Sequence, residues 1–545
     1  GITRKLDHLA ELGVDVIWLS PVYRSPHDDN GYDISDYQDV DPAFGTLADL
    51  DALIAEATKR DIGIVMDLVV NHTSDEHPWF VDARSSRDSV KRDWYWWRDA
   101  KPGTVAGEPG AEPTNWGPFF SGSAWQLDEQ TGQYYLHLFS RKQPDLNWEN
   151  PELRAEIYAM MRWWLDRGIA GFRMDVINLI SKRLGPGGEL SDDVLRPDGW
   201  GDGFSQYVDG PRMHAFLAEM HREVFDAFPG TYLTVGETPG TTLEQGRLYT
   251  DPANREVDMV FQFEHMGLDH GAGGKLDPKP LHLSDLKANL ARWQDGLAES
   301  GWNSLYWNNH DQPRIVSRWG DDGEHRVVSA KTLATALHLH RGTPYIYQGE
   351  ELGTPNAGFT TLEQYRDLES LNYAADAQRL GLDPDAVLRG LAAQSRDNAR
   401  TGVAWDGAPN GGFTTGTPWI EMTPGWEHTN AEAARADQGS VFHHYRRLVE
   451  LRHTEPAVVD GDFVLLAPDH EALWAYTRTT ATTQLVVVAN LSGEELEVDL
   501  AELGLTEGGA LDDVAIASHA DARRPDGEGR LSLRPWESVV FRRAL

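Results

Sequence analysis

Three strand-length segments of this chain are apolar and end in a carboxylic acid: Asp175, Glu237 and Asp311. An apolar run of this length is typical of a buried strand. Such runs alternate with segments of helical periodicity, which predicts an α/β fold whose parallel strands close into a barrel. Because barrel enzymes carry their chemistry at the carboxyl ends of the strands, we expect the three acids at one mouth of the barrel.

The alternation of strands and helices covers most of the chain. We expect strands near residues 14, 62, 171, 232, 257, 303 and 343, and helices over 2–12, 47–60, 151–168 and 441–456. These strands are one fewer than a (β/α)8 TIM barrel needs. The missing first strand is expected before residue 1.

Two stretches interrupt the alternation. Residues 73–141 are rich in Trp, Pro and Gly, and residues 353–440 are a second irregular insertion after the last strand. A loop as long as the first stretch is usually functional when it lies inside a compact domain. The barrel is therefore predicted in two parts, 1–72 and 142–456.

The pattern changes again after the last predicted helix. Residues 457–545 contain short strand-like runs with turn residues between them, and two of these runs are 484–490 and 531–541. Such spacing is typical of antiparallel strands. We therefore expect a C-terminal antiparallel β-sandwich.

The composition narrows the classes of function. The 545 residues carry a net charge of −37, which argues against binding to nucleic acid or to a membrane surface. No apolar run reaches the roughly 18 residues of a membrane helix, and no cysteine is present. We expect a cytoplasmic protein that is a monomer or a homodimer. The acidic surplus fits either an ordinary solvated surface or adaptation to high salt.

Four short segments of the chain match sequence motifs that occur together in one known family. The segments 67–72, 171–175, 235–237 and 309–311 stand in the order found there, at plausible spacing. With them the chain resembles glycoside hydrolase family 13, the α-amylase superfamily, and most closely its oligo-1,6-glucosidase and α-glucosidase branch. The resemblance implies a catalytic TIM barrel in which residues 73–141 are the B domain that overhangs the active site.

The resemblance also implies how the acids divide the reaction. Asp175 would be the nucleophile, Glu237 the general acid/base and Asp311 the stabiliser of the cationic transition state, in a retaining double displacement. Arg173 lies two residues before Asp175 and so on the same side of a strand, where its guanidinium would keep Asp175 ionised. Glu237 has no basic residue near it in sequence, so an apolar wall would raise its pKa and let it carry the proton.

Further residues match the family's sugar-binding positions. Asp29 and Tyr32 would close the subsite of the terminal glucose and make an exo-acting pocket, although the residues before Tyr32 also encode a turn. His72 and His310 each follow an asparagine at a strand end and would donate to sugar hydroxyls without ionising. The remaining substrate-binding candidates are Arg173, Arg400 and two aromatic residues that could equally be core residues, Phe120 and Phe139.

Val176 directly follows the predicted nucleophile. In this branch of the family a valine there accompanies α-1,6 preference, and a threonine accompanies α-1,4 preference. The two side chains differ by a hydroxyl group beside the scissile bond, and contacts on this scale are worth about 1–3 kcal/mol. We therefore predict release of glucose from the non-reducing end of small isomalto-oligosaccharides.

Other activities on the same scaffold stay open: an α-1,4-preferring or broad α-glucosidase or transglucosidase, a sucrose isomerase and a trehalose-6-phosphate hydrolase. Residues 312–320 lack the charged loop of the isomerases, and the sequence locates no phosphate pocket. A non-catalytic binding module is a more distant alternative, since such relatives carry a membrane span and tend to lose the acids. We expect that the activity requires no cofactor. The resemblance makes a structural Ca²⁺ or Mg²⁺ plausible, with its ligands upstream of residue 1 and no metal-ligand motif in the chain itself.

Overall fold

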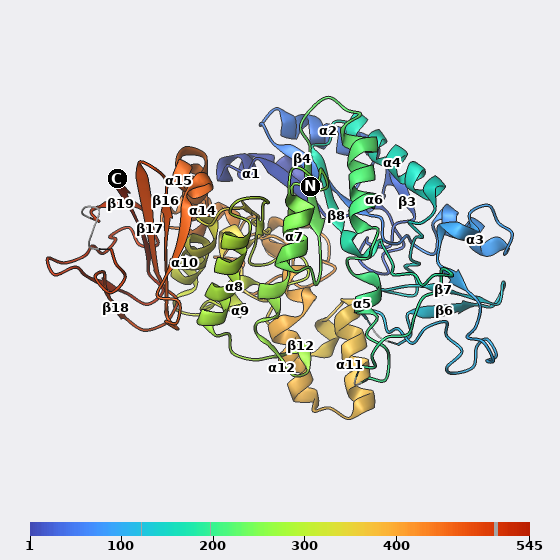
Figure 1. The fold of residues 1–545 in the computed structure, drawn as a ribbon. Coiled ribbons are helices and arrows are strands. Elements are labelled where there is room, and N and C mark those ends of the chain that lie inside the picture. The colour runs from blue at the N-terminus through green and yellow to red at the C-terminus, as the bar shows by residue number, and fades with distance from the viewer. Residues whose placement is uncertain (121, 197, 506–510) are drawn as a thin grey trace. The chain divides into compact units, whose positions relative to one another are not determined.

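The computed structural model of the chain comprises two compact units. Figure 1 labels helices and strands by the names that are used below. The first unit contains residues 1–10 and 15–263, and the second contains 11–14 and 264–545. The structure describes residues 1–120, 122–196, 198–505 and 511–545. The finer division into a barrel, a B domain and a C-terminal domain stays a prediction.

A sheet of parallel strands organises the first unit. Its order is β1-β4-β8-β9-β10, and every neighbouring pair is parallel. The strands lie where the alternation predicts them, and the central three are almost completely buried, as expected for a parallel sheet. Their bounds are β1 (Val16–Leu19), β4 (Gly63–Val69), β8 (Gly171–Asp175), β9 (Leu233–Glu237) and β10 (Met259–Phe261).

The register of the central strands places charged residues side by side. Asp67 of β4 pairs with Arg173 of β8, which pairs with Val235 of β9. The strands approach closely at Gly171, where φ is 148° and a Cβ would lie 1.9 Å from the carbonyl oxygen of Leu233. Because only glycine fits there, this residue allows β8 and β9 to pair at this point.

Two predicted helices of the first unit are confirmed with clear start signals. Helix α2 (Leu47–Thr58) begins with a capping box between Thr46 and Asp49. Helix α4 (Pro151–Asp166) begins after Asn150, whose side chain accepts from two backbone N–H groups. The helix predicted over 2–12 is present as η1 (Ile2–Lys5) and α1 (Leu6–Leu12). The other helical segments are η3 (Ile177–Leu179), α5 (Phe204–Tyr207), α6 (Met213–Met220), the π-helical η4 (His221–Phe225) and α7 (Leu243–Thr250).

The described part of 73–141 contains a helix and a small antiparallel sheet of order β5-β7-β6. Its core includes Trp96, Trp116, Trp125 and Leu136, so several of the tryptophans that mark this stretch in the sequence are packing residues. A hairpin of β2 (Tyr23–Arg24) and β3 (Asp36–Val40) precedes it. The elements are α3 (Pro78–Ser85), η2 (Arg92–Trp94), β5 (Trp97–Arg98), β6 (Trp125–Asp128) and β7 (Gln133–Leu136).

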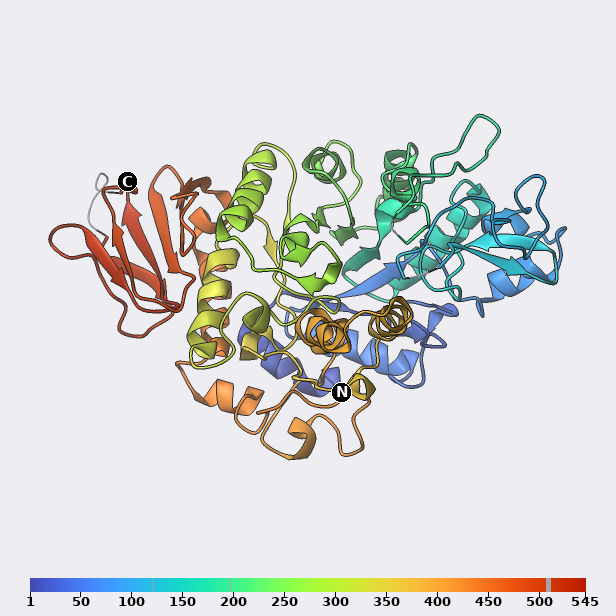
Figure 2. The same ribbon diagram turned by 90° about the horizontal axis from the view of Figure 1, so that it is seen from below.

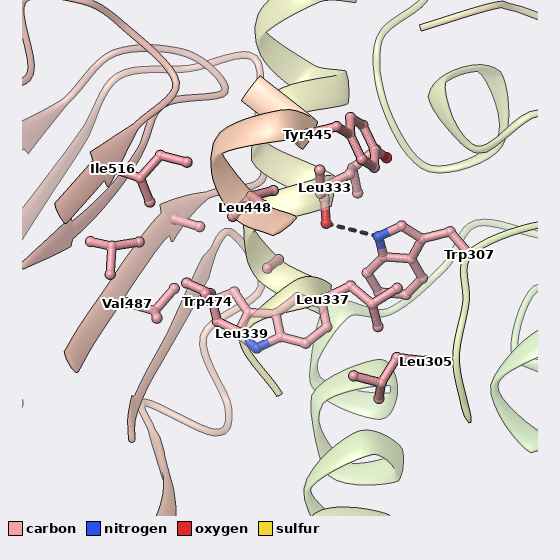
Figure 3. Packing of buried hydrophobic residues seen from close by; sticks show 14 of the residues in the cluster. Leu305, Trp307, Leu333, Leu337, Leu339, Tyr445, Leu448, Trp474, Val487 and Ile516 are labelled. Atoms are coloured by element: carbon pink, nitrogen blue, oxygen red, sulfur yellow. Dashed lines mark hydrogen bonds between the residues drawn. The ribbon is translucent and has the colours of Figure 1, made fainter. Parts of the chain in front are cut away.

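The second unit joins helices to the C-terminal strands through one apolar core. Figure 3 shows this core, in which Nε1 of Trp307 donates a hydrogen bond of 2.8 Å to the carbonyl oxygen of Leu333. The ring of Trp307 meets that of Trp474 edge-on at 6.0 Å. The parallel pair β13 (Ser304–Leu305) and β14 (Thr343–Pro344) confirms the last two predicted strands. The helices are α8 (Leu283–Gly296), α9 (Ile315–Arg318), α10 (Arg326–His338), α14 (Val441–Thr454) and α15 (Pro456–Asp460).

The prediction that 353–440 is irregular is wrong in part. The stretch contains α11 (Leu368–Leu380) and α12 (Pro384–Gln394), which pack side by side (Figure 2). Helix α11 buries only Ser370 and Ala377, so it lacks the apolar stripe by which a helix is recognised. The other short elements of the unit are η5 (Glu264–Gly267), β11 (His270–Gly271), β12 (Gly274–Pro278), η6 (Glu350–Leu352), η7 (Leu362–Gln364), η8 (Arg396–Ala399), η9 (Pro409–Gly412) and α13 (Ala431–Ala436).

The C-terminal residues form antiparallel strands, as predicted. The main sheet has the order β15-β16-β17-β21-β19, and β18 pairs with β20. Alternate residues of β17 enter two different cores, Leu485 and Val487 on one face and Val486 and Val488 on the other. The run predicted over 531–541 is two strands, because a turn interrupts it. The bounds are β15 (Asp462–Leu466), β16 (Leu473–Thr479), β17 (Thr483–Asn490), β18 (Leu496–Asp499), β19 (Asp513–Ala517), β20 (Arg530–Leu533) and β21 (Ser538–Ala544).

Candidate active site

Strands β4, β8 and β9 bring three buried carboxylates onto one guanidinium, and two of the acids, Asp175 and Glu237, are the last residues of their strands. Nη1 of Arg173 lies 2.9 Å from Oδ1 of Asp67 and 2.6 Å from Oδ1 of Asp175. Its Nη2 lies 2.6 Å from Oε2 of Glu237. All four side chains are at most 9% exposed. We call these four residues the Arg173 cluster.

The predicted contact between Arg173 and Asp175 is confirmed. The apolar wall expected around Glu237 is wrong in part, because Arg173 contacts this acid as well. Glu237 shares the same arginine, because β8 and β9 are neighbours in the sheet although they are far apart in sequence. Proximity to Arg173 therefore does not distinguish a nucleophile from an acid. The roles of nucleophile and general acid must instead depend on where each carboxyl group lies relative to the bound sugar.

The protonation of the Arg173 cluster follows from its imbalance of charge. Burial raises the pKa of Asp175 and that of Asp67, and the single guanidinium opposes this only in part. The expectation that Arg173 simply keeps Asp175 ionised is thus corrected, because two further acids compete for the same cation. A cluster with three acids and one cation tends to hold a proton.

Asp67 is a site residue to which the sequence reasoning assigned no role. It accepts hydrogen bonds from Nε1 of Trp18 at 3.1 Å and from the hydroxyl of Tyr32 at 3.0 Å, in addition to its contact with Arg173. Its position within an apolar strand was a usable signal, since a charge buried there needs a partner. Asp67 therefore holds Arg173 and Tyr32 in place.

The predicted pocket residues of the first unit meet around a glutamine. Nε2 of Gln143 donates to Oδ2 of Asp29 at 3.1 Å and lies 3.2 Å from Nε2 of His72. The same nitrogen of His72 lies 3.2 Å from the carbonyl oxygen of Tyr32. Burial lowers the pKa of His72 to about 4, so the imidazole is neutral at pH 7 and can donate without ionising. Gln143 begins a stretch, 143–150, that also matches the family, but sequence reasoning alone assigned it no role in the pocket.

The two predicted aromatic residues lie near this group. The ring of Phe139 is 5.1 Å from that of His72 and 6.1 Å from that of Phe120. Phe139 also stacks on Phe119 at 4.9 Å. The aromatic residues thus form a continuous apolar surface beside His72.

Val176, the predicted linkage residue, contacts the cluster through its backbone. Its N–H donates to Oε2 of Glu237 at 3.1 Å. The residue is 8% exposed, and it belongs to the same apolar cluster as Leu136 and Tyr207.

The other predicted residues, His310, Asp311 and Arg400, lie in the second unit. In their site, unlike the Arg173 cluster, the acids do not outnumber the arginines. Oδ1 of Asp311 lies 2.8 Å from Nη2 of Arg400 and 3.3 Å from Nη1 of Arg396. Both arginines also bind Asp367, at 2.6 and 2.8 Å. Burial alone would raise the pKa of Asp311, but His310 and the two arginines hold it well below its usual range. Neither Arg396 nor Asp367 was found from the sequence.

Within the described ranges, no group of three or more His, Asp or Glu side chains is arranged to hold a metal ion. In the same ranges, no helix combines the length and apolar character needed to cross a membrane.

Known families match almost all of the chain. Residues 1–461 match the family described as alpha amylase, catalytic domain, and residues 473–540 match the alpha-amylase SusG C-terminal domain. The chain is 52% identical to an oligo-1,6-glucosidase of Parageobacillus thermoglucosidasius over 544 residues, which is 99% of this chain and 94% of that protein.

Solved structures also match nearly the whole chain. Trehalose-6-phosphate hydrolase of Bacillus licheniformis has a TM-score of 0.91 and 46% identity, with 100% of this chain and 95% of that chain covered. Isomaltulose synthase of Klebsiella sp. LX3 has a TM-score of 0.92 and 38% identity, with 99% and 94% covered.

Proposed function

Because the chain belongs to the α-amylase family of glycoside hydrolases, we propose that it is a retaining, exo-acting oligo-1,6-glucosidase that releases glucose from isomalto-oligosaccharides. The observation that carries the proposal is the Arg173 cluster at the ends of adjacent strands. It supplies two carboxylates on a rigid sheet, which is the minimum that a glycosidase needs. Family membership also supports the (β/α)8 barrel as the catalytic fold.

The reaction proceeds in two displacements. Asp175 attacks the anomeric carbon while Glu237 gives a proton to the departing glycosidic oxygen, and a covalent glycosyl-enzyme forms. Glu237 then removes a proton from water, which attacks the same carbon and releases glucose and Asp175. Arg173 stabilises the carboxylates as they change charge and keeps them in a fixed geometry.

The pocket residues select the end of the substrate. Asp29 and His72, oriented by Gln143, are suited to bind hydroxyls of the terminal glucose, and the Tyr32 ring is suited to stack on it. Asp311 and Arg400 are proposed from the family resemblance to bind hydroxyls of the distorted sugar. The permanently ionised state of Asp311 suits the stabilisation of positive charge.

The linkage preference is assigned to the Val176 side chain. The test is glucose release from isomaltose, maltose, sucrose and trehalose 6-phosphate, with Asp175→Ala as the inactive control. Fast release from isomaltose, slow release from maltose and none from the variant are expected. Preference for trehalose 6-phosphate would instead assign the activity of the Bacillus licheniformis relative, and conversion of sucrose that of the Klebsiella relative.

A further inference from the structure

The backbone turn that follows Asp175 is strained. Val176 has φ 35° and ψ 41°, the left-handed region, in which a β-branched residue is an outlier. Strain of this kind persists only where the surrounding structure enforces it, and it is concentrated at functional sites. The question is therefore what enforces the turn and what the turn holds.

Asn178 links the turn to a neighbouring segment. It is completely buried, and its Nδ2 lies 3.0 Å from the carbonyl oxygen of Pro239 and 3.3 Å from Oγ1 of Thr241. The same nitrogen lies 3.1 Å from Oδ1 of Asp209. Pro239 and Thr241 lie two and four residues after the end of β9. The turn after one catalytic strand is thus tied to the segment after the other.

The turn holds one oxygen of Glu237. The N–H of Val176 donates to Oε2 at 3.1 Å, and Nη2 of Arg173 lies 2.6 Å from the same atom. Two N–H donors on one carboxyl oxygen favour negative charge on that oxygen. A proton on this carboxyl group is therefore favoured on Oε1.

We propose that the turn of residues 176–179, held by Asn178, is a positioning device for the general acid/base. Oε2 of Glu237 is fixed by Val176 and Arg173, and Oε1 carries the transferable proton. That proton moves to the glycosidic oxygen as the bond from this oxygen to the anomeric carbon breaks and Asp175 bonds to that carbon. The inference rests on the proposed function, since it assigns a proton-transfer role to Glu237.

The test compares leaving groups. Asn178→Ser removes the tie without touching Glu237, and kcat/KM is measured for isomaltose and for p-nitrophenyl α-glucoside. Isomaltose needs a proton on its leaving sugar, whereas nitrophenolate leaves with little acid assistance. We expect kcat/KM to fall about 10²-fold for isomaltose, the scale of general acid catalysis, and to change little for the nitrophenyl substrate.

A matched control is Asn490→Ser in the C-terminal strands. Asn490 is equally buried, and its Nδ2 donates to the carbonyl oxygens of Glu494 and Arg534. Asn490→Ser should leave the ratio of the two kcat/KM values unchanged. If Asn178→Ser does not fold, the milder Thr241→Val is measured in the same way, with a smaller loss of the same selective kind expected.

An equal fall for both substrates, or no fall for either, would overturn the positioning role. A wild-type enzyme that cleaves maltose but not isomaltose would overturn only the α-1,6 assignment, because the comparison can then be made with maltose. A wild-type enzyme that cleaves no glucoside would overturn both.

Discussion

The two carboxylate sites differ in how many cations they contain. In the first unit three buried acids share the single guanidinium of Arg173, while in the second unit Asp311 and Asp367 share Arg396 and Arg400. Loss of solvent acts to raise the pKa of the acids in both sites, yet the pKa of Asp175 is raised and those of Asp311 and Asp367 are lowered. The number of cations that face the acids decides whether the pKa of an acid is raised or lowered. The first site can hold a proton for transfer, and the second keeps a fixed negative charge.

The largest effect is expected from Arg173→Lys. An ammonium group cannot reach three carboxylates in the geometry of a guanidinium, so kcat/KM for isomaltose should fall on the order of 10³-fold. The second site offers the control, Arg396→Lys, which leaves Arg400 on both acids. Arg396→Lys should lower kcat/KM for isomaltose clearly less than Arg173→Lys does. Equal losses would mean that the cation count does not distinguish the sites.

Removal of one negative charge should change the Tm in opposite directions at the two sites. A buried acid with a raised pKa destabilises the folded protein as the pH rises from about 4 toward that pKa, since the folded state binds the extra proton. Asp175→Asn should therefore raise the Tm at pH 7, and the gain should shrink toward pH 4. An acid with a lowered pKa stabilises the fold above about pH 4, so Asp311→Asn should lower the Tm at pH 7.

Differential scanning calorimetry of both variants across this pH range provides the measurement. A lower Tm for Asp175→Asn at every pH would show that Arg173 already compensates the three acids fully.

A smaller effect is expected on the pH profile of activity. The charge of Asp67 raises the pKa of Asp175, which must be ionised to attack. Asp67→Asn should therefore move the acid limb of kcat/KM to lower pH, together with a loss of rate because Arg173 loses a partner. The control Asp367→Asn should leave that limb in place, since Asp311 stays ionised throughout. If the acid limb of Asp67→Asn does not move, the charge of Asp67 does not affect the ionisation of Asp175.

Local pattern predicted most of the framework but not the contacts between strands. The apolar runs located the seven strands expected between residues 14 and 343, and the two-residue spacing placed Arg173 beside Asp175. The pairing of Arg173 with Glu237 depends on the register of β8 against β9, which no local pattern encodes. Helix α11 was missed for a related reason, because it buries too few apolar side chains to show its period.

The smallest effect distinguishes both buried sites from the surface. With a net charge of −37, the folded chain repels itself, and salt screens exposed charges over a Debye length of about 3 Å at 1 M. Buried pairs such as Arg173 with Asp67 are screened much less. The Tm should therefore rise between low and molar NaCl, while the acid limb of the activity profile should move little. A flat Tm would show that the acidic surface is solvated without dependence on salt. A limb that moved with salt would instead show that ions reach the Arg173 cluster and that its protonation is not set by burial alone.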